Sequence, residues 1–187
     1  YDAETAKLYK YDPDKARALL KEANVPQGFV IDMIGYTDQD SVRRAEIVIE
    51  LLAEIVLKAQ FTNGSIAEMS AAFFGKDKKG AGLLSAWTGR PDPSLTYTLM
   101  YSKDSYFNAG RADVPAEMPE ALKATRATEN IEERKKAFAK VQRLVMENAL
   151  VCPLAFQFEL DAHAGKVRGY KPNLLGKPKY DGVWLES

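Results

Sequence analysis

The hydrophobic and polar positions of the chain follow two spacings, one helical and one typical of buried strands. Apolar residues at helical spacing predict helices over residues 11–24, 42–59, 67–74, 117–128 and 130–149, with a short helix beginning at Ser94. Short apolar runs predict strands over residues 29–36, 60–66, 81–86, 151–159 and 183–185. Helices that alternate with strands in this order are typical of the α/β class, so we expect a mixed, partly parallel sheet flanked by helices.

Local signals define the ends of two of these helices. Asp12 precedes Pro13, and an N-cap carboxylate followed by proline at the first helical position is a common helix start. Asn24 then ends the first helix. The last long helix begins after Asn130, which together with Glu133 resembles a capping box. The charged run 132–136 in that helix is expected to be a solvated face without chemistry.

The single cysteine and the single histidine offer little chemistry. Cys152 lies in the apolar run 151–159, where we expect a buried small hydrophobe, and it has no second cysteine for a disulfide. His163 has no other histidine or cysteine at ligand spacing, so the sequence predicts no metal site. Nucleophilic chemistry by these two residues would require both to be exposed and adjacent, which their surroundings do not favour.

Charge and hydropathy exclude several classes of protein. The 187 residues contain 26 lysines and arginines and 26 aspartates and glutamates, and this balance does not favour nucleic acid or an anionic membrane as a partner. The most apolar helical stretch, residues 47–59, is interrupted by charges and cannot span a bilayer. Residues 1–5 have neither the cationic start nor the apolar stretch of a signal peptide, so we expect the chain to come from a longer one.

Enzymatic motifs are scarce. The sequence has no nucleophile elbow, no phosphate loop and no glycine-rich dinucleotide fingerprint, and it implies no cofactor. Carboxylates are numerous, so an acid–base pair built from them stays open at this point.

Trp87 is the most distinctive candidate site residue. It follows the apolar run 81–86, and ligands of open α/β sheets bind at the carboxyl ends of strands. A tryptophan suits a core position equally well, and the residues alone do not decide between the two.

Three segments, in this order, resemble the carboxy-terminal part of the family 5 extracellular solute-binding proteins, which include dipeptide, oligopeptide and nickel binders. The first is the Tyr-Asp-Pro helix start at 11–13 with Leu-Leu-Lys-Glu-Ala at 19–23. The second is the strand, tryptophan and Asp-Pro loop at 84–93. The third is Glu-Glu-Arg at 132–134, followed by a helix that leads into Pro-Leu at 153–154. The resemblance covers about residues 9–186.

This resemblance implies one lobe of a two-lobed, periplasmic-binding-protein-like fold that is not an enzyme. Residues 1–160 would form the second lobe, and residues 161–187 would be a return segment to the first lobe. Such a protein captures a small molecule or peptide between its lobes and delivers it to the permease subunits of an ABC importer. It works in the periplasm or elsewhere outside the cytoplasm. It would reach the membrane only through the permease or through an anchor outside this chain.

The same resemblance implies that Trp87, Arg90 and Asp92 bind the ligand, and Asn108, at the end of an aromatic stretch that could wall a cleft, completes the candidate set. Peptide-binding members carry an aspartate three residues after this tryptophan, which pairs with the ligand's amino group. Arg90 stands there instead, and its guanidinium would bind a carboxylate or phosphate. The ligand would then be a short peptide or a peptide-like molecule of acidic character.

Arg90 and Asp92 also have plainer interpretations. Arg90 would then be a solvated loop arginine. Asp92 could take the acidic role, pair with Arg90 or cap the helix that begins at Ser94, and capping is favoured. Tyr101 is expected to pack in the core, and Asn108 is left as a polar contact to the ligand.

Two other function classes remain compatible with the sequence. One is a carboxylate-based α/β hydrolase or transferase domain. The other is a structural interaction module, which fits zero net charge and strongly striped helices.

Overall fold

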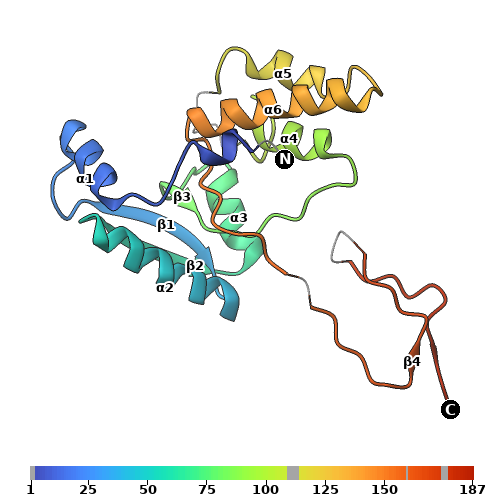
Figure 1. The fold of residues 1–187 in the computed structure, drawn as a ribbon. Coiled ribbons are helices and arrows are strands. Elements are labelled where there is room, and N and C mark those ends of the chain that lie inside the picture. The colour runs from blue at the N-terminus through green and yellow to red at the C-terminus, as the bar shows by residue number, and fades with distance from the viewer. Residues whose placement is uncertain (1–2, 109–113, 159, 174–176) are drawn as a thin grey trace.

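Helices and parallel strands alternate through the first half of the chain, which confirms the α/β class. The computed structural model describes residues 3–108, 114–158, 160–173 and 177–187. A short 3-10 helix, η1 (Thr5–Lys7), is followed by α1 (Pro13–Glu22), β1 (Val30–Tyr36), α2 (Gln39–Glu54), β2 (Lys58–Gly64), α3 (Ile66–Phe74) and β3 (Gly82–Leu83). The second half contains α4 (Pro93–Tyr101), α5 (Met118–Ala124), α6 (Ile131–Glu147), β4 (Val167–Arg168) and β5 (Trp184–Leu185) (Figure 1).

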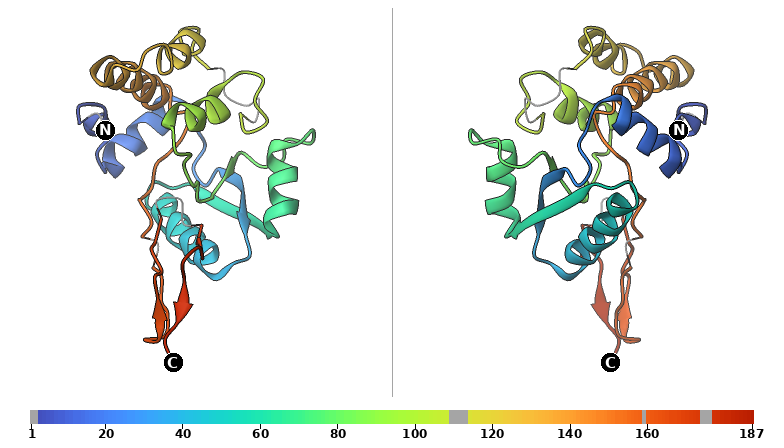
Figure 2. Two further views of the ribbon diagram at one scale, coloured as in Figure 1. Left: turned by 90° about the vertical axis from the view of Figure 1, so that its right-hand side faces the viewer. Right: turned by 90° about the vertical axis from the view of Figure 1, so that its left-hand side faces the viewer.

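The main sheet has three parallel strands in the order β2-β1-β3. Val30 pairs with Lys58 and Tyr36 with Gly64, while Met33 pairs with Gly82 on the other side of β1. Helices α2 and α3 lie on opposite faces of the sheet (Figure 2). The expectation of a mixed sheet is therefore wrong for these strands, because the only antiparallel pairing among the described residues is in the separate β4–β5 hairpin.

Side-chain caps start the helices where the sequence predicts them. Asp12 accepts a hydrogen bond from the backbone N–H of Lys15 at 2.9 Å, and Asn130 accepts from the N–H groups of Glu132 and Glu133 at 3.0 and 3.1 Å. Each cap satisfies backbone donors that have no partner within the helix.

Helix α2 ends at Glu54, five residues before the predicted end at residue 59. The chain turns at Val56, whose φ is 60°, and then enters β2 at Lys58. A positive φ in a β-branched residue is strained, so tertiary pairing with β1 overrides the helical spacing of the apolar residues here.

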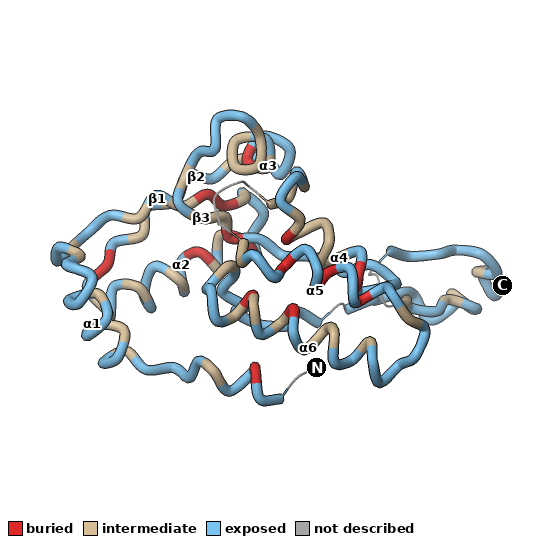
Figure 3. Tube along the Cα trace, turned by 90° about the horizontal axis from the view of Figure 1, so that it is seen from above, coloured by how far each residue is buried: buried red, intermediate tan, exposed pale blue. Residues whose placement is uncertain are grey.

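The best-buried core lies among the helices of the second half. Its buried members are Tyr101, Met118, Ala121, Leu122, Val141 and Val145. These side chains join α4, α5 and α6, and Figure 3 shows the buried positions facing one another between these helices. Tyr101 packs there as expected, and burial raises the pKa of its hydroxyl.

The segment after α6 does not form the buried strand predicted for residues 151–159. Residues 151–158 have no regular structure, and residue 159 lies outside the described residues. Phe156 and Phe158 are 98% and 88% exposed, and the segment runs away from the packed elements (Figure 1). Residues 151–158 are largely apolar, but within the described part of the chain they do not pair with any strand.

Cys152 is exposed, which corrects the prediction that it is buried. We therefore expect its thiol to react stoichiometrically with Ellman's reagent in the folded chain, at the rate measured for the urea-unfolded chain to within about threefold. A thiol that reacts only after unfolding would show that residues 151–158 pack in solution.

Candidate functional site

The strand order of the main sheet reverses close to Trp87. From β1 the chain crosses to β2 on one side, and from β2 it returns past β1 to β3 on the other side. Ligands of open α/β sheets bind outside the carboxyl ends of the strands where the order reverses in this way. Trp87 follows the end of β3 by four residues, so the loop that it begins lies at this reversal point.

Trp87 stands at the edge of an aromatic cluster. Its ring meets that of Phe107 edge-to-face, with the centroids 4.9 Å apart, and Phe107 meets Phe74 at 5.4 Å and Tyr106 at 5.3 Å. Trp87 nevertheless remains 36% exposed. A ring that is braced on one edge and open on the other is suited to contact a ligand, because it loses little freedom on binding.

Short hydrogen bonds fix the loop from Trp87 to Pro93 against the start of α4. The backbone N–H of Arg90 donates to Oγ1 of Thr96 at 2.9 Å. Oδ1 of Asp92 accepts from the N–H of Ser94 at 2.8 Å, so Asp92 caps α4 as favoured from the sequence. These two hydrogen bonds connect Arg90 and Asp92 of the loop to the first residues of α4.

Arg134 of α6 contacts the same loop from the side. Its Nη2 donates to both carboxylate oxygens of Asp92, at 2.9 and 2.7 Å, and its Nε donates to the carbonyl of Thr125 at 3.0 Å. The guanidinium also lies 5.5 Å from the ring centroid of Phe138. The prediction that residues 132–136 form only a solvated face is therefore wrong at Arg134, whose side chain is 28% exposed.

These contacts determine the charge of the loop. The hydrogen bonds from Ser94, followed by the bond from Arg134, lower the pKa of Asp92 to about 2, so its carboxylate is ionised at neutral pH. Arg90 is exposed, and among the residues that the structure describes none pairs with its guanidinium. The loop therefore contains one carboxylate, Asp92, whose charge is balanced by Arg134, and one cation, Arg90, that is available to a ligand.

Asn108 lies beside the aromatic cluster, but its side chain forms a hydrogen bond within the turn that contains it. Its Nδ2 donates to the carbonyl of Ser102 at 3.2 Å, and its backbone N–H donates to Ser105 at 3.1 Å. Its neighbour Phe107 contacts Trp87, so Asn108 is brought near the candidate site as a residue that shapes the turn.

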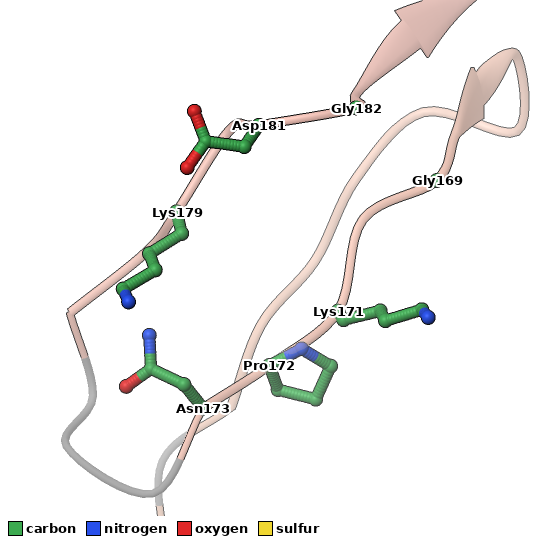
Figure 4. A pocket seen from close by; sticks show the side chains of 7 residues that line it. All are labelled: Gly169, Lys171, Pro172, Asn173, Lys179, Asp181 and Gly182. Atoms are coloured by element: carbon green, nitrogen blue, oxygen red, sulfur yellow. The ribbon is translucent and has the colours of Figure 1, made fainter.

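Elsewhere, the described residues offer weaker candidates. An open hollow lies in the carboxy-terminal hairpin, lined by residues that include Lys171, Asn173, Lys179 and Asp181, and Figure 4 shows their side chains pointing in different directions. No group of three or more histidine, cysteine, aspartate or glutamate side chains in the described ranges is arranged to hold a metal ion. None of the helices described is long and apolar enough to cross a membrane.

Comparison with known proteins gives a consistent set of relatives, although no family model matches the chain. It is 25% identical over 186 residues to the dipeptide-binding protein of Escherichia coli, which covers 95% of this chain and 34% of that protein. It is 31% identical over 192 residues to heme-binding protein A of Haemophilus influenzae, with coverage of 96% and 34%. The chain thus spans about a third of the length of these curated relatives.

The fold also matches solved structures. The periplasmic binding protein DppA of Helicobacter pylori, in complex with the peptide STSA, superposes with a TM-score of 0.78 at 22% identity, over 97% of this chain and 36% of that one. The chain is therefore similar, over nearly its whole length, to part of several solute-binding proteins, in agreement with its resemblance to family 5. Two of the motifs that resemble this family, the Asp-Pro loop and the Glu-Glu-Arg segment, meet in space through Asp92 and Arg134.

Proposed function

We propose that this chain is a ligand-binding lobe of a substrate-binding protein that serves an ABC importer, and that it is not an enzyme. The observation that carries the proposal is the exposed Trp87–Pro93 loop, braced by aromatic rings and hydrogen bonds at the reversal point of the sheet. The relatives are named for binding a dipeptide or heme rather than for catalysis. This argues against the carboxylate-based hydrolase or transferase considered above.

The ligand we propose is a short peptide or a peptide-like small molecule of acidic character. The peptide class is supported by the dipeptide-binding relative and by the solved neighbour that holds the peptide STSA. The acidic character rests on Arg90, because an exposed guanidinium attracts a carboxylate or phosphate and repels an ammonium. Trp87 would contact the apolar part of the ligand and Asn108 would shape the adjoining turn. Asp92 would contribute through the loop rather than by direct contact.

The chain would supply one side of a cleft. We propose that residues 1–160 form the second lobe and that residues 161–187 return to a first lobe outside this sequence. Closure of the two lobes would bury the ligand, and the closed form would dock on the permease subunits. The protein would act in the periplasm or elsewhere outside the cytoplasm.

Trp87 provides the test of this function. In the full-length protein that contains this chain, the tryptophan fluorescence should shift when di- and tripeptides are titrated and one of them binds, and Trp87→Phe should remove that shift. Trp87→Ala should weaken the binding of that peptide by more than about 1 kcal/mol, because the ring would lose its contact area with the ligand. Isothermal titration calorimetry measures the affinity.

Trp184→Ala is the matched control, since Trp184 lies in β5 at 54% exposure and away from the loop. It should leave the affinity unchanged. If Trp87→Ala lowers the unfolding free energy while the folded fraction binds the peptide as the wild type does, Trp87 is a core residue and the proposed site is wrong.

A further inference from the structure

The Trp87–Pro93 loop contains two opposite charges two residues apart, and they have different partners. Asp92 could neutralise Arg90 within the loop, in which case the site would offer no net charge to a ligand. In the structure Asp92 is instead held by Arg134, which donates to both of its carboxylate oxygens from a helix 42 positions along the chain. Arg90 then keeps its charge for solvent or ligand.

Arg134 is itself firmly positioned. Its Nε bonds to the carbonyl of Thr125, a residue with no exposed surface at the end of α5. Its guanidinium lies against Phe138, whose ring meets that of Tyr97 in α4 at 5.8 Å. The planar fork of arginine can make these contacts at once, whereas a lysine ammonium would satisfy only part of them.

We propose that Arg134 is a specificity-determining positioning residue: by sequestering Asp92, it leaves Arg90 as the uncompensated cation of the ligand loop. The inference rests on the proposed function, since it explains how the loop acquires its preference for anions. In a variant in which Asp92 is released, Asp92 would pair with Arg90 and the loop would offer no net charge to a ligand. Arg134 acts through Asp92 and does not touch the ligand.

Labelling with phenylglyoxal tests this without a ligand, because the reagent modifies arginine side chains more slowly when a carboxylate pairs with them. The 187-residue chain is labelled, and the rate at each arginine is read by peptide mass spectrometry. In the wild type Arg90 should react faster than Arg134. In Arg134→Gln the released Asp92 should pair with Arg90 and slow its labelling by about two- to fivefold, the range set by exposed ion pairs.

Two further variants separate a charge effect from a loss of structure. Arg134→Gln combined with Asp92→Asn should return Arg90 to the wild-type rate, because asparagine still caps α4 but cannot neutralise a cation. Arg143→Gln, which removes another arginine of α6 that pairs with Glu147 at 3.3 Å, should leave Arg90 unchanged. Circular dichroism confirms that each variant is folded.

Asp92→Asn alone decides the matter if Arg134→Gln does not fold. The labelling of Arg134 should then rise by about two- to fivefold while that of Arg90 stays constant. A faster Arg90 in Asp92→Asn, or an unchanged Arg90 in a folded Arg134→Gln, would overturn the proposal. Since no ligand is present, these outcomes are independent of whether the full-length protein binds acidic peptides, and either proposal can fail alone.

Discussion

Replacing Met118 with alanine is expected to lower the free energy of unfolding of the chain by about 2–5 kcal/mol. Met118 has no exposed surface, and it is packed in the cluster formed by Tyr101, Leu122 and Val141. Alanine would leave a cavity that the surrounding helices can fill only in part. The loss of transfer free energy and the cavity therefore add.

Urea unfolding followed by circular dichroism measures the effect. Ile131→Ala is the control, because Ile131 is 69% exposed at the start of α6 and its truncation should change the unfolding free energy by less than about 0.5 kcal/mol. If Met118→Ala costs no more than the control, α4, α5 and α6 do not share a cooperative core. The loop that α6 holds through Arg134 would then lack the rigid support described above.

The local elements could be predicted because their signals lie within a few residues. Asp12 and Asn130 each cap a helix by bonding to N–H groups two or three residues ahead, a pattern that depends on no distant contact. The Asp92-Pro93 start of α4 follows the same rule. The α/β class follows from the order of the elements, and β3 and β5 both fall within predicted strands.

Burial could not be predicted with the same success. Phe156 and Phe158 have the composition of a core strand, and Ile47 and Leu51 widen the apolar stripe of α2, yet all four are exposed. An apolar pattern indicates that a surface is suited to burial. It does not indicate which other part of the protein would cover that surface. The position of Cys152 was mispredicted for this reason.

The candidate site was predictable in part. Trp87 directly follows a predicted strand in the sequence and lies four residues after β3 in the structure, and the parallel order β2-β1-β3 gives that position its significance. The ion pair between Asp92 and Arg134 could not be predicted from the spacing of residues in the sequence. The two residues belong to different elements, which are brought together only when α4 packs against α6. Phe107 and Phe74 likewise join Trp87 from separate elements.

Removal of the Arg90 guanidinium should reveal the ligand class. In the full-length protein, Arg90→Ala is expected to weaken the binding of an acidic dipeptide such as Ala-Asp by about 2 kcal/mol or more, since closure would leave the anion without its partner. The effect should exceed that of an open surface pair because lobe closure excludes water and weakens screening. Arg90→Asp should weaken this binding further.

Neutral and basic dipeptides make the comparison specific. Ala-Ala should lose much less affinity than Ala-Asp on Arg90→Ala, and Ala-Lys should gain affinity on Arg90→Asp, because the sign of the loop charge is reversed. Arg126→Ala, at another exposed arginine, should alter none of these affinities. If both Arg90 substitutions bind Ala-Asp as the wild type does, Arg90 faces solvent in the closed protein. The charge of the ligand would then be recognised by the other lobe, and the acidic class would have no support from this chain.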